Sequence, residues 1–145
     1  MSDKYFVDTN ILVYADDTSA GAKHVRAKAV VEDLWRQQSG VVSTQVLQEL
    51  CVNLRRNAGH PVDLSTAREI VADYLSWDVV TNTGQSILEA LQLEEHYQIS
   101  FWDALVVQAA EASGATVLYS EDLSDGQTYR GVRVVNPPRT AVTDN

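Results

Sequence analysis

Cysteine, glycine and proline are scarce in this sequence. There is one cysteine, Cys51, among 145 residues, which excludes an internal disulfide and a zinc site built from several cysteines. The three histidines show neither an H-x-H nor an H-x-x-x-H spacing, which argues against a histidine-rich transition-metal site. With only 7 glycines, 3 prolines and 45% hydrophobic residues, the chain is neither collagen-like nor low in complexity. We therefore expect a folded domain.

Long apolar runs and basic charge are also lacking. No apolar stretch reaches the ~20 residues that cross a bilayer, and the N-terminus has no signal-peptide pattern, so we expect a soluble, cytoplasmic protein with no membrane partner. The formal net charge of −9 argues against binding nucleic acid by overall electrostatic attraction. A local site is still open, because a divalent cation held by carboxylates reverses the field around it.

Short apolar strands alternate with helices along the chain. Strands are predicted at 5–7, 41–42, 78–80, 116–119 and 132–135, and helices near Asn10, over 22–38, from Ser43 or Thr44, and over 63–76, 84–97 and 100–114. The apolar stripes expected to be buried include Val25, Ala29 and Leu34, then Val46, Leu50 and Leu54, then Ile87, Leu88 and Leu91. This alternation predicts an α/β fold with a central, mostly parallel β-sheet flanked by helices on both faces. We expect one domain over 1–136 and a short C-terminal tail over 137–145.

Four carboxylates lie where they can converge on the carboxyl edge of such a sheet, which is where α/β proteins bind ligands. Asp8 directly follows the first strand and Asp122 follows a later one, while Glu49 and Asp103 lie on helices. Each of them also has a structural explanation. Asp8 could cap the next helix, Glu49 could be a solvated helix residue, Asp103 completes a capping box with Ser100, and Asp122 could be an ordinary turn residue.

Taken together, the acids favour a site for a hard divalent cation. Clustered carboxylates raise each other's pKa unless a cation neutralises them, and Mg²⁺ or Mn²⁺ prefers such oxygen ligands. These ions commonly serve phosphoryl chemistry. The sequence contains no phosphate-binding P-loop, no dinucleotide-binding glycine motif and no nucleophile elbow, so nucleotide cradles and serine hydrolysis lose support.

The acids fall within four stretches whose order and spacing are specific. The stretches are Tyr5–Tyr14 (YFVDTNILVY), Ser43–Leu50 (STQVLQEL), Ile99–Val106 (ISFWDALV) and Leu118–Leu123 (LYSEDL). Together they resemble the PIN domain family, and in particular the VapC-like toxins of type II (VapBC) toxin–antitoxin systems. The likeness covers residues 4–136 and implies a PIN-like fold.

The resemblance also implies the chemistry and the partners. It assigns both metal binding and catalysis to Asp8, Glu49, Asp103 and Asp122, and supporting roles to Thr9, Asn10, Ser120 and Asp125. Glu121 beside them is left open. The implied activity is that of an endoribonuclease that uses Mg²⁺ or Mn²⁺ to activate water against an RNA phosphodiester. As a toxin it would inhibit translation and growth, pair with a cognate antitoxin that covers the active site, and form a homodimer.

Two other interpretations and one group of basic residues stay open. A catalytically inactive PIN-like module that binds RNA or protein is disfavoured by the intact acids. A phosphoacceptor receiver domain would need paired N-terminal acids and a late lysine, whereas Asp8 stands alone and no lysine follows Lys28. The basic residues that could meet RNA phosphates, or simply form a solvated face, are Lys23, Arg26, Lys28, Arg55 and Arg56.

Overall fold

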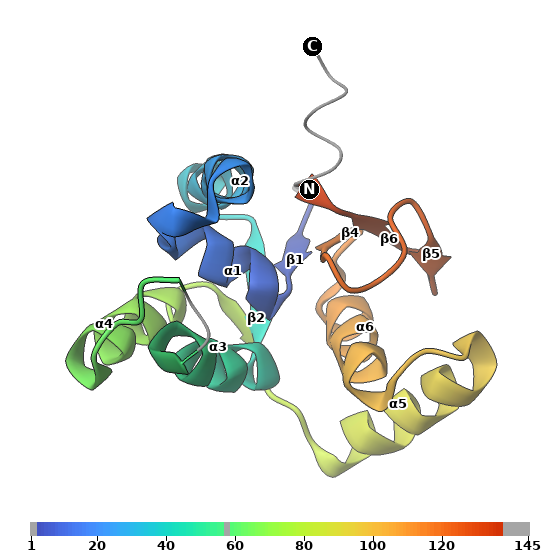
Figure 1. The fold of residues 1–145 in the computed structure, drawn as a ribbon. Helices are drawn as coiled ribbons and strands as arrows, with labels where there is room; N and C mark the ends of the chain where they lie inside the picture. Colours follow the sequence, from blue (N-terminus) through green and yellow to red (C-terminus); the bar gives the residue numbers. More distant parts are fainter. Residues whose placement is uncertain (1–2, 57–58, 138–145) are drawn as a thin grey trace.

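The computed structural model describes residues 3–56 and 59–137, so the predicted tail lies outside the described residues from 138 onward. In this part of the chain, six strands form one sheet in the order β3-β2-β1-β4-β6-β5 (Figure 1). The strands are β1 (Tyr5–Val7), β2 (Gly40–Ser43), β3 (Asp78–Val80), β4 (Val117–Tyr119), β5 (Thr128–Tyr129) and β6 (Val132–Val135). Every neighbouring pair is parallel except β5 and β6.

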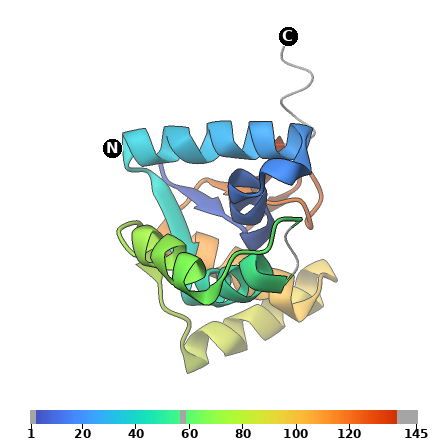
Figure 2. The ribbon, with the colours of Figure 1, turned by 60° about the vertical axis from the view of Figure 1, so that its left-hand side comes forward.

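Helices lie on both sides of this sheet. They are α1 (Thr9–Asp16), α2 (Ala22–Gln37), α3 (Thr44–Arg56), α4 (Leu64–Tyr74), α5 (Gly84–Tyr97) and α6 (Phe101–Ser113), with a 3-10 turn, η1 (Thr18–Ala20), after α1. Figure 1 shows α1 and α2 on one side and α5 and α6 on the other, and Figure 2 shows α2 running across α1. The predicted α/β class, with a mostly parallel sheet, is confirmed.

Local sequence signals set several of the element boundaries. Phe6 and Val7 are fully buried, as expected for a strand covered on both faces. Of the two residues proposed to begin the next helix, Ser43 is the cap, because its Oγ accepts a hydrogen bond of 3.2 Å from the Val46 amide. The apolar stripe predicted for α3, which includes Leu50 and Leu54, is fully buried.

The stripe predicted for α2 was wrong at Val25 and Ala29 and is confirmed at Leu34, which is buried. Val25 is 65% exposed and Ala29 is also exposed, whereas the buried face carries Ala27, Val31 and Leu34. Ala27 and Val31 each follow one of the two exposed residues by two positions, a rotation of about 200°, so they lie on nearly the opposite side of the helix. The packing of α2 against α1 decides which face is buried.

The stripe predicted for α5 was also wrong. Ile87, Leu88 and Leu91 are 47%, 58% and 48% exposed. The buried residues of α5 are Ser86, Ala90 and Leu93. Because α5 packs on α6 through this smaller face, its bulky residues are left outside. The two-residue strand β5, which lies between β4 and β6 in the chain, was not predicted from the sequence. Among the described helices, none is both long and apolar enough to span a membrane.

Candidate active site

The parallel pairing of β1 with β4 brings two distant parts of the chain together. Val7 lies opposite Tyr119, and the Asp8 amide donates a hydrogen bond of 2.9 Å to the Tyr119 carbonyl. Asp8 and Ser120 therefore leave the sheet side by side at its carboxyl edge. Asp8 then caps α1, as expected for an aspartate that follows a strand.

The Asp8 carboxylate is buried and held by two hydrogen bonds. It accepts one of 2.8 Å from the Thr9 amide and one of 2.9 Å from Ser120 Oγ. Burial, together with the smaller effects of the charges on Asp122 and Glu49, raises the pKa of Asp8 from 3.8 to about 7, although the two hydrogen bonds act to lower it. An anion at this position is thus unfavourable unless a positive charge joins it.

The two residues after Asp8 hold two of the other acids. Thr9 Oγ1 donates a hydrogen bond of 2.8 Å to Glu49 Oε1, which connects α1 with α3. The Asn10 side-chain amide lies 3.1 Å from each carboxylate oxygen of Asp122. The first turn of α1 therefore contacts three of the four predicted acids.

The remaining acid, Asp103, lies in the first turn of α6. Its amide donates a hydrogen bond of 3.1 Å to Ser100 Oγ, which confirms Ser100 as the cap. Partial burial raises the pKa of Asp122, and the charges of Asp103, Glu121 and Glu49 add to this effect, while Asn10 opposes it. Asp103 and Asp122 are therefore close enough for their charges to interact.

Comparison with known proteins decides the family. A family profile described as PIN domain matches residues 5–124, a range that includes all four acids. The chain belongs to the PIN domain family. No curated protein sequence shows significant similarity to the chain.

Solved structures share the fold of this PIN domain. VapC20 of Mycobacterium tuberculosis, a toxin that cleaves the sarcin-ricin loop, is 25% identical, with 82% of this chain and 90% of that chain covered and a TM-score of 0.63. The DNA-bound VapBC of Salmonella typhimurium is 16% identical over 92% of this chain and 97% of that chain, with a TM-score of 0.63. PAE2754 of Pyrobaculum aerophilum is 22% identical over 93% and 91%, with a TM-score of 0.60. At these lower identities, the latter two show a common fold.

The donor set of this PIN domain suits a hard cation. Asp8, Glu49, Asp103 and Asp122 supply only carboxylate oxygens, and the raised pKa values of Asp8 and Asp122 reflect burial and repulsion that a cation would offset. Within the described residues, no three acidic, histidine or cysteine side chains are already grouped closely enough to hold one ion. The charges of the acids therefore affect one another, but the carboxylates are not already arranged as the ligands of one ion.

Asp125 and Glu121, the two further acids near the four candidates in the sequence, make contacts with other parts of the chain. Asp125 Oδ1 accepts a hydrogen bond of 2.9 Å from the Asn136 amide, which ties the loop to the residue after β6. Glu121 accepts a hydrogen bond from Tyr14 and pairs with Lys23, so its carboxylate is directed to α1 and α2. Burial raises the pKa of Glu121, but the hydrogen bonds from Lys23 and Tyr14 outweigh this effect and hold its pKa below the ordinary value.

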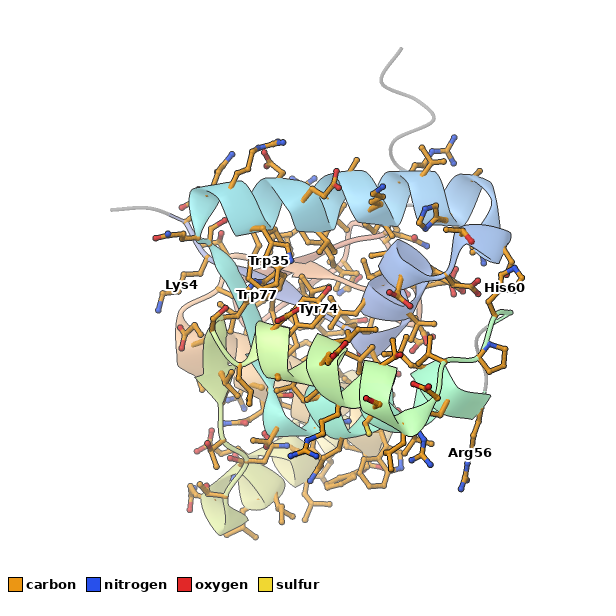
Figure 3. The ribbon with its side chains drawn as sticks, turned by 90° about the vertical axis from the view of Figure 1, so that its left-hand side faces the viewer. Lys4, Trp35, Arg56, His60, Tyr74 and Trp77 are labelled. Atoms are coloured by element: carbon orange, nitrogen blue, oxygen red, sulfur yellow. The ribbon has the colours of Figure 1, made fainter. Side chains whose placement is uncertain are left out.

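Tyr14 was missed by the sequence analysis, because its partner is 107 positions away and no motif marks the pair. Lys23, one of the basic residues that could meet RNA phosphates or form a solvated face, pairs with Glu121 in this structure. Arg55 and Arg56 are exposed near the end of α3, where Figure 3 shows Arg56 directed outward. A role in RNA binding stays a hypothesis for all five basic residues named from the sequence.

Proposed function

We propose that this PIN domain is a Mg²⁺- or Mn²⁺-dependent endoribonuclease that hydrolyses RNA phosphodiesters as the toxin of a VapBC-like pair. The observation that carries the proposal is the linkage of the acids through one helical turn. Asp8 caps α1, Thr9 holds Glu49 and Asn10 holds Asp122. The fold shared with VapC20, at 25% identity, supports RNA as the substrate class.

We assign Asp8, Asp103 and Asp122 as candidate metal ligands and Glu49 to a second ion or to the attacking water. When bound, a divalent ion supplies positive charge to the phosphodiester and lowers the pKa of water. The chain orients the ligands: Ser120 and the Thr9 amide fix Asp8, and both oxygens of Asp122 meet the Asn10 amide. With a pKa of about 7, Asp8 must release its proton to serve as a ligand at neutral pH.

Cleavage of RNA and the chemistry of its ends test this assignment. We expect cleavage with Mg²⁺ or Mn²⁺ that leaves a 5′-phosphate and a 3′-hydroxyl, because water rather than the ribose hydroxyl attacks. EDTA and an Asp8→Asn variant should abolish it, whereas a single 2′-deoxy sugar at the cut site should not. Cyclic-phosphate ends that persist in EDTA would refute the mechanism, and RNA that is bound but never cut would instead identify an inactive binding module.

We further propose a cognate antitoxin as partner, a homodimeric toxin and a cytoplasmic location, where its RNA substrate would be. The Salmonella and Rickettsia felis structures are VapBC complexes bound to DNA, and they share the fold of this chain. Co-expression with the product of a neighbouring open reading frame should give a stable complex in which RNA cleavage is suppressed. Light scattering of the isolated chain would give its oligomeric state, and a monomer would contradict the dimer.

A further inference from the structure

Glu121, the residue directly before Asp122, is held by side chains from two helices. Tyr14 on α1 donates a hydrogen bond of 2.6 Å to Oε1, and Lys23 Nζ on α2 lies 2.7 Å from Oε2. Lys23 Nζ is also 3.4 Å from the Tyr14 hydroxyl and 5.0 Å from the centre of its ring. Both oxygens of Glu121 are therefore occupied, and its side chain is only 24% exposed.

These contacts extend a series that fastens the segment after β4 to α1. Ser120 donates to Asp8 at the start of α1, Asn10 donates to Asp122, and Tyr14 donates to Glu121. Asn10 and Tyr14 are four residues apart, so they lie on the same face of the helix. Three consecutive residues of the segment are thus bound along one side of α1.

The contact at Glu121 differs from the other two because it includes a positively charged donor, Lys23, whereas Ser120 and Asn10 donate from uncharged groups. Asp122 is repelled by Asp103, Glu121 and Glu49, and Asn10 offers it only an uncharged amide, so the positive charge of Lys23 on Glu121 also offsets one of these repulsions. Isolated surface ion pairs stabilise proteins little. The Lys23–Glu121 pair differs because Glu121, the less exposed partner, also accepts a short hydrogen bond from Tyr14. In addition, Glu121 directly precedes Asp122 in the chain, so holding Glu121 restricts the position of Asp122.

We propose that Glu121, Tyr14 and Lys23 form a clamp that positions Asp122 against α1 for cation binding. The inference rests on the proposed function, since it assumes that Asp122 is a ligand. It makes Glu121 a positioning residue that contacts neither metal nor RNA. It also assigns Lys23 to holding this carboxylate rather than to binding an RNA phosphate.

Mn²⁺ binding, measured by the loss of the free-ion EPR signal, tests the clamp in Glu121→Gln, Tyr14→Phe and Lys23→Met. Partners that orient metal ligands typically contribute about 10-fold or more to metal affinity. We expect each variant to bind Mn²⁺ about 10-fold more weakly, to regain most of its cleavage rate at saturating Mn²⁺ and to keep its KM for RNA. Lys23→Arg should retain affinity, and adding Lys23→Met to Glu121→Gln should cost little more than Glu121→Gln alone.

A second ion pair provides matched controls. Lys4 Nζ, labelled in Figure 3, lies 3.0 Å from Asp78 Oδ2 at the amino ends of β1 and β3, whereas Asp8 and Asp122 follow the carboxyl ends of β1 and β4. Lys4→Met and Asp78→Asn remove the same charges and should leave Mn²⁺ affinity unchanged.

Three results would overturn the clamp. One is a lower melting temperature in the clamp variants with unchanged Mn²⁺ affinity, which would show a merely structural role. Another is a raised KM for RNA in Lys23→Met with normal Mn²⁺ affinity, which would show a phosphate contact. The third is unchanged Mn²⁺ binding in Asp122→Asn, which would remove the proposed metal site itself and so distinguish that failure from failure of the clamp alone.

Discussion

Asp8 combines two environments with opposite effects on its charge. The Thr9 amide and Ser120 Oγ favour the carboxylate, while burial and the nearby acids favour the protonated form. The second effect dominates, since its pKa is about 7. The metal-free protein is therefore destabilised when Asp8 ionises, as the proposed role of Asp8 in binding a cation predicts.

The pH dependence of the free energy of unfolding tests this effect of Asp8. The folded protein holds the Asp8 proton more tightly than the unfolded chain, so its contribution to stability is present below pH 3.8 and is lost as pH rises to about 7. In EDTA, Asp8→Asn should remove this loss and exceed wild type at pH 8 by up to roughly 4 kcal/mol, but not at pH 4. Urea unfolding at both pH values measures the difference, and equal stability of the two proteins at pH 8 would contradict the raised pKa.

Variants of Thr9 test whether cleavage requires the Glu49 carboxylate to be held in place by a hydrogen bond. Its hydroxyl holds Glu49 at 2.8 Å, and the residue is only 3% exposed. Thr9→Val keeps the shape but removes the donor, so we expect a fall of about 10-fold in kcat and a stability change near 1 kcal/mol. Thr9→Ser, which keeps the hydroxyl, should stay near wild type. Full activity in Thr9→Val would show that Glu49 needs no such support.

At the scale of single elements, β2 depends on a close approach between backbone and ring. A Cβ on Gly40 would lie 2.5 Å from two ring carbons of Trp77, which packs in turn on Trp35 and Tyr74 (Figure 3). The absence of a side chain at the start of β2 therefore lets this aromatic cluster cover the strand.

Gly40→Ala should accordingly destabilise the protein by about 1–3 kcal/mol through overpacking. Gly84→Ala is the matched control, because a Cβ there meets nothing within 4 Å and the residue begins α5. That control should be neutral or stabilising by about 0.5 kcal/mol. Urea unfolding compares the two, and equal stabilities would show that the Trp77 ring moves aside without cost.

For the whole molecule, the cation site should couple metal binding to folding. The acids come from four separate segments, so the unfolded chain cannot assemble them, and bound Mn²⁺ stabilises only the native state. We expect millimolar Mn²⁺ to raise the melting temperature of wild type and to have a much smaller effect on Asp103→Asn, in which asparagine removes the charge. An unchanged wild-type midpoint, together with full activity in Asp103→Asn, would refute a shared site.

The predicted fold and the observed fold agree where the signals are local. Apolar triplets such as Tyr5–Val7 became strands, and cap residues such as Ser100 began helices at the expected positions. They differ where packing against another helix decides which face is buried. Val25 and Ala29 on α2 and the whole stripe expected on α5 are exposed, because α1 and α6 cover other faces of those helices.

The sequence by itself determined the α/β class and five of the six described strands, and it singled out the four acids as candidates, since hydrophobic period, capping and motif spacing depend on near neighbours. Only the tertiary structure decided that Asp8 is buried with a pKa of about 7 and that Glu121 faces Tyr14 and Lys23. The physical reason is that desolvation and ion pairing depend on residues about a hundred positions apart, which no local pattern records.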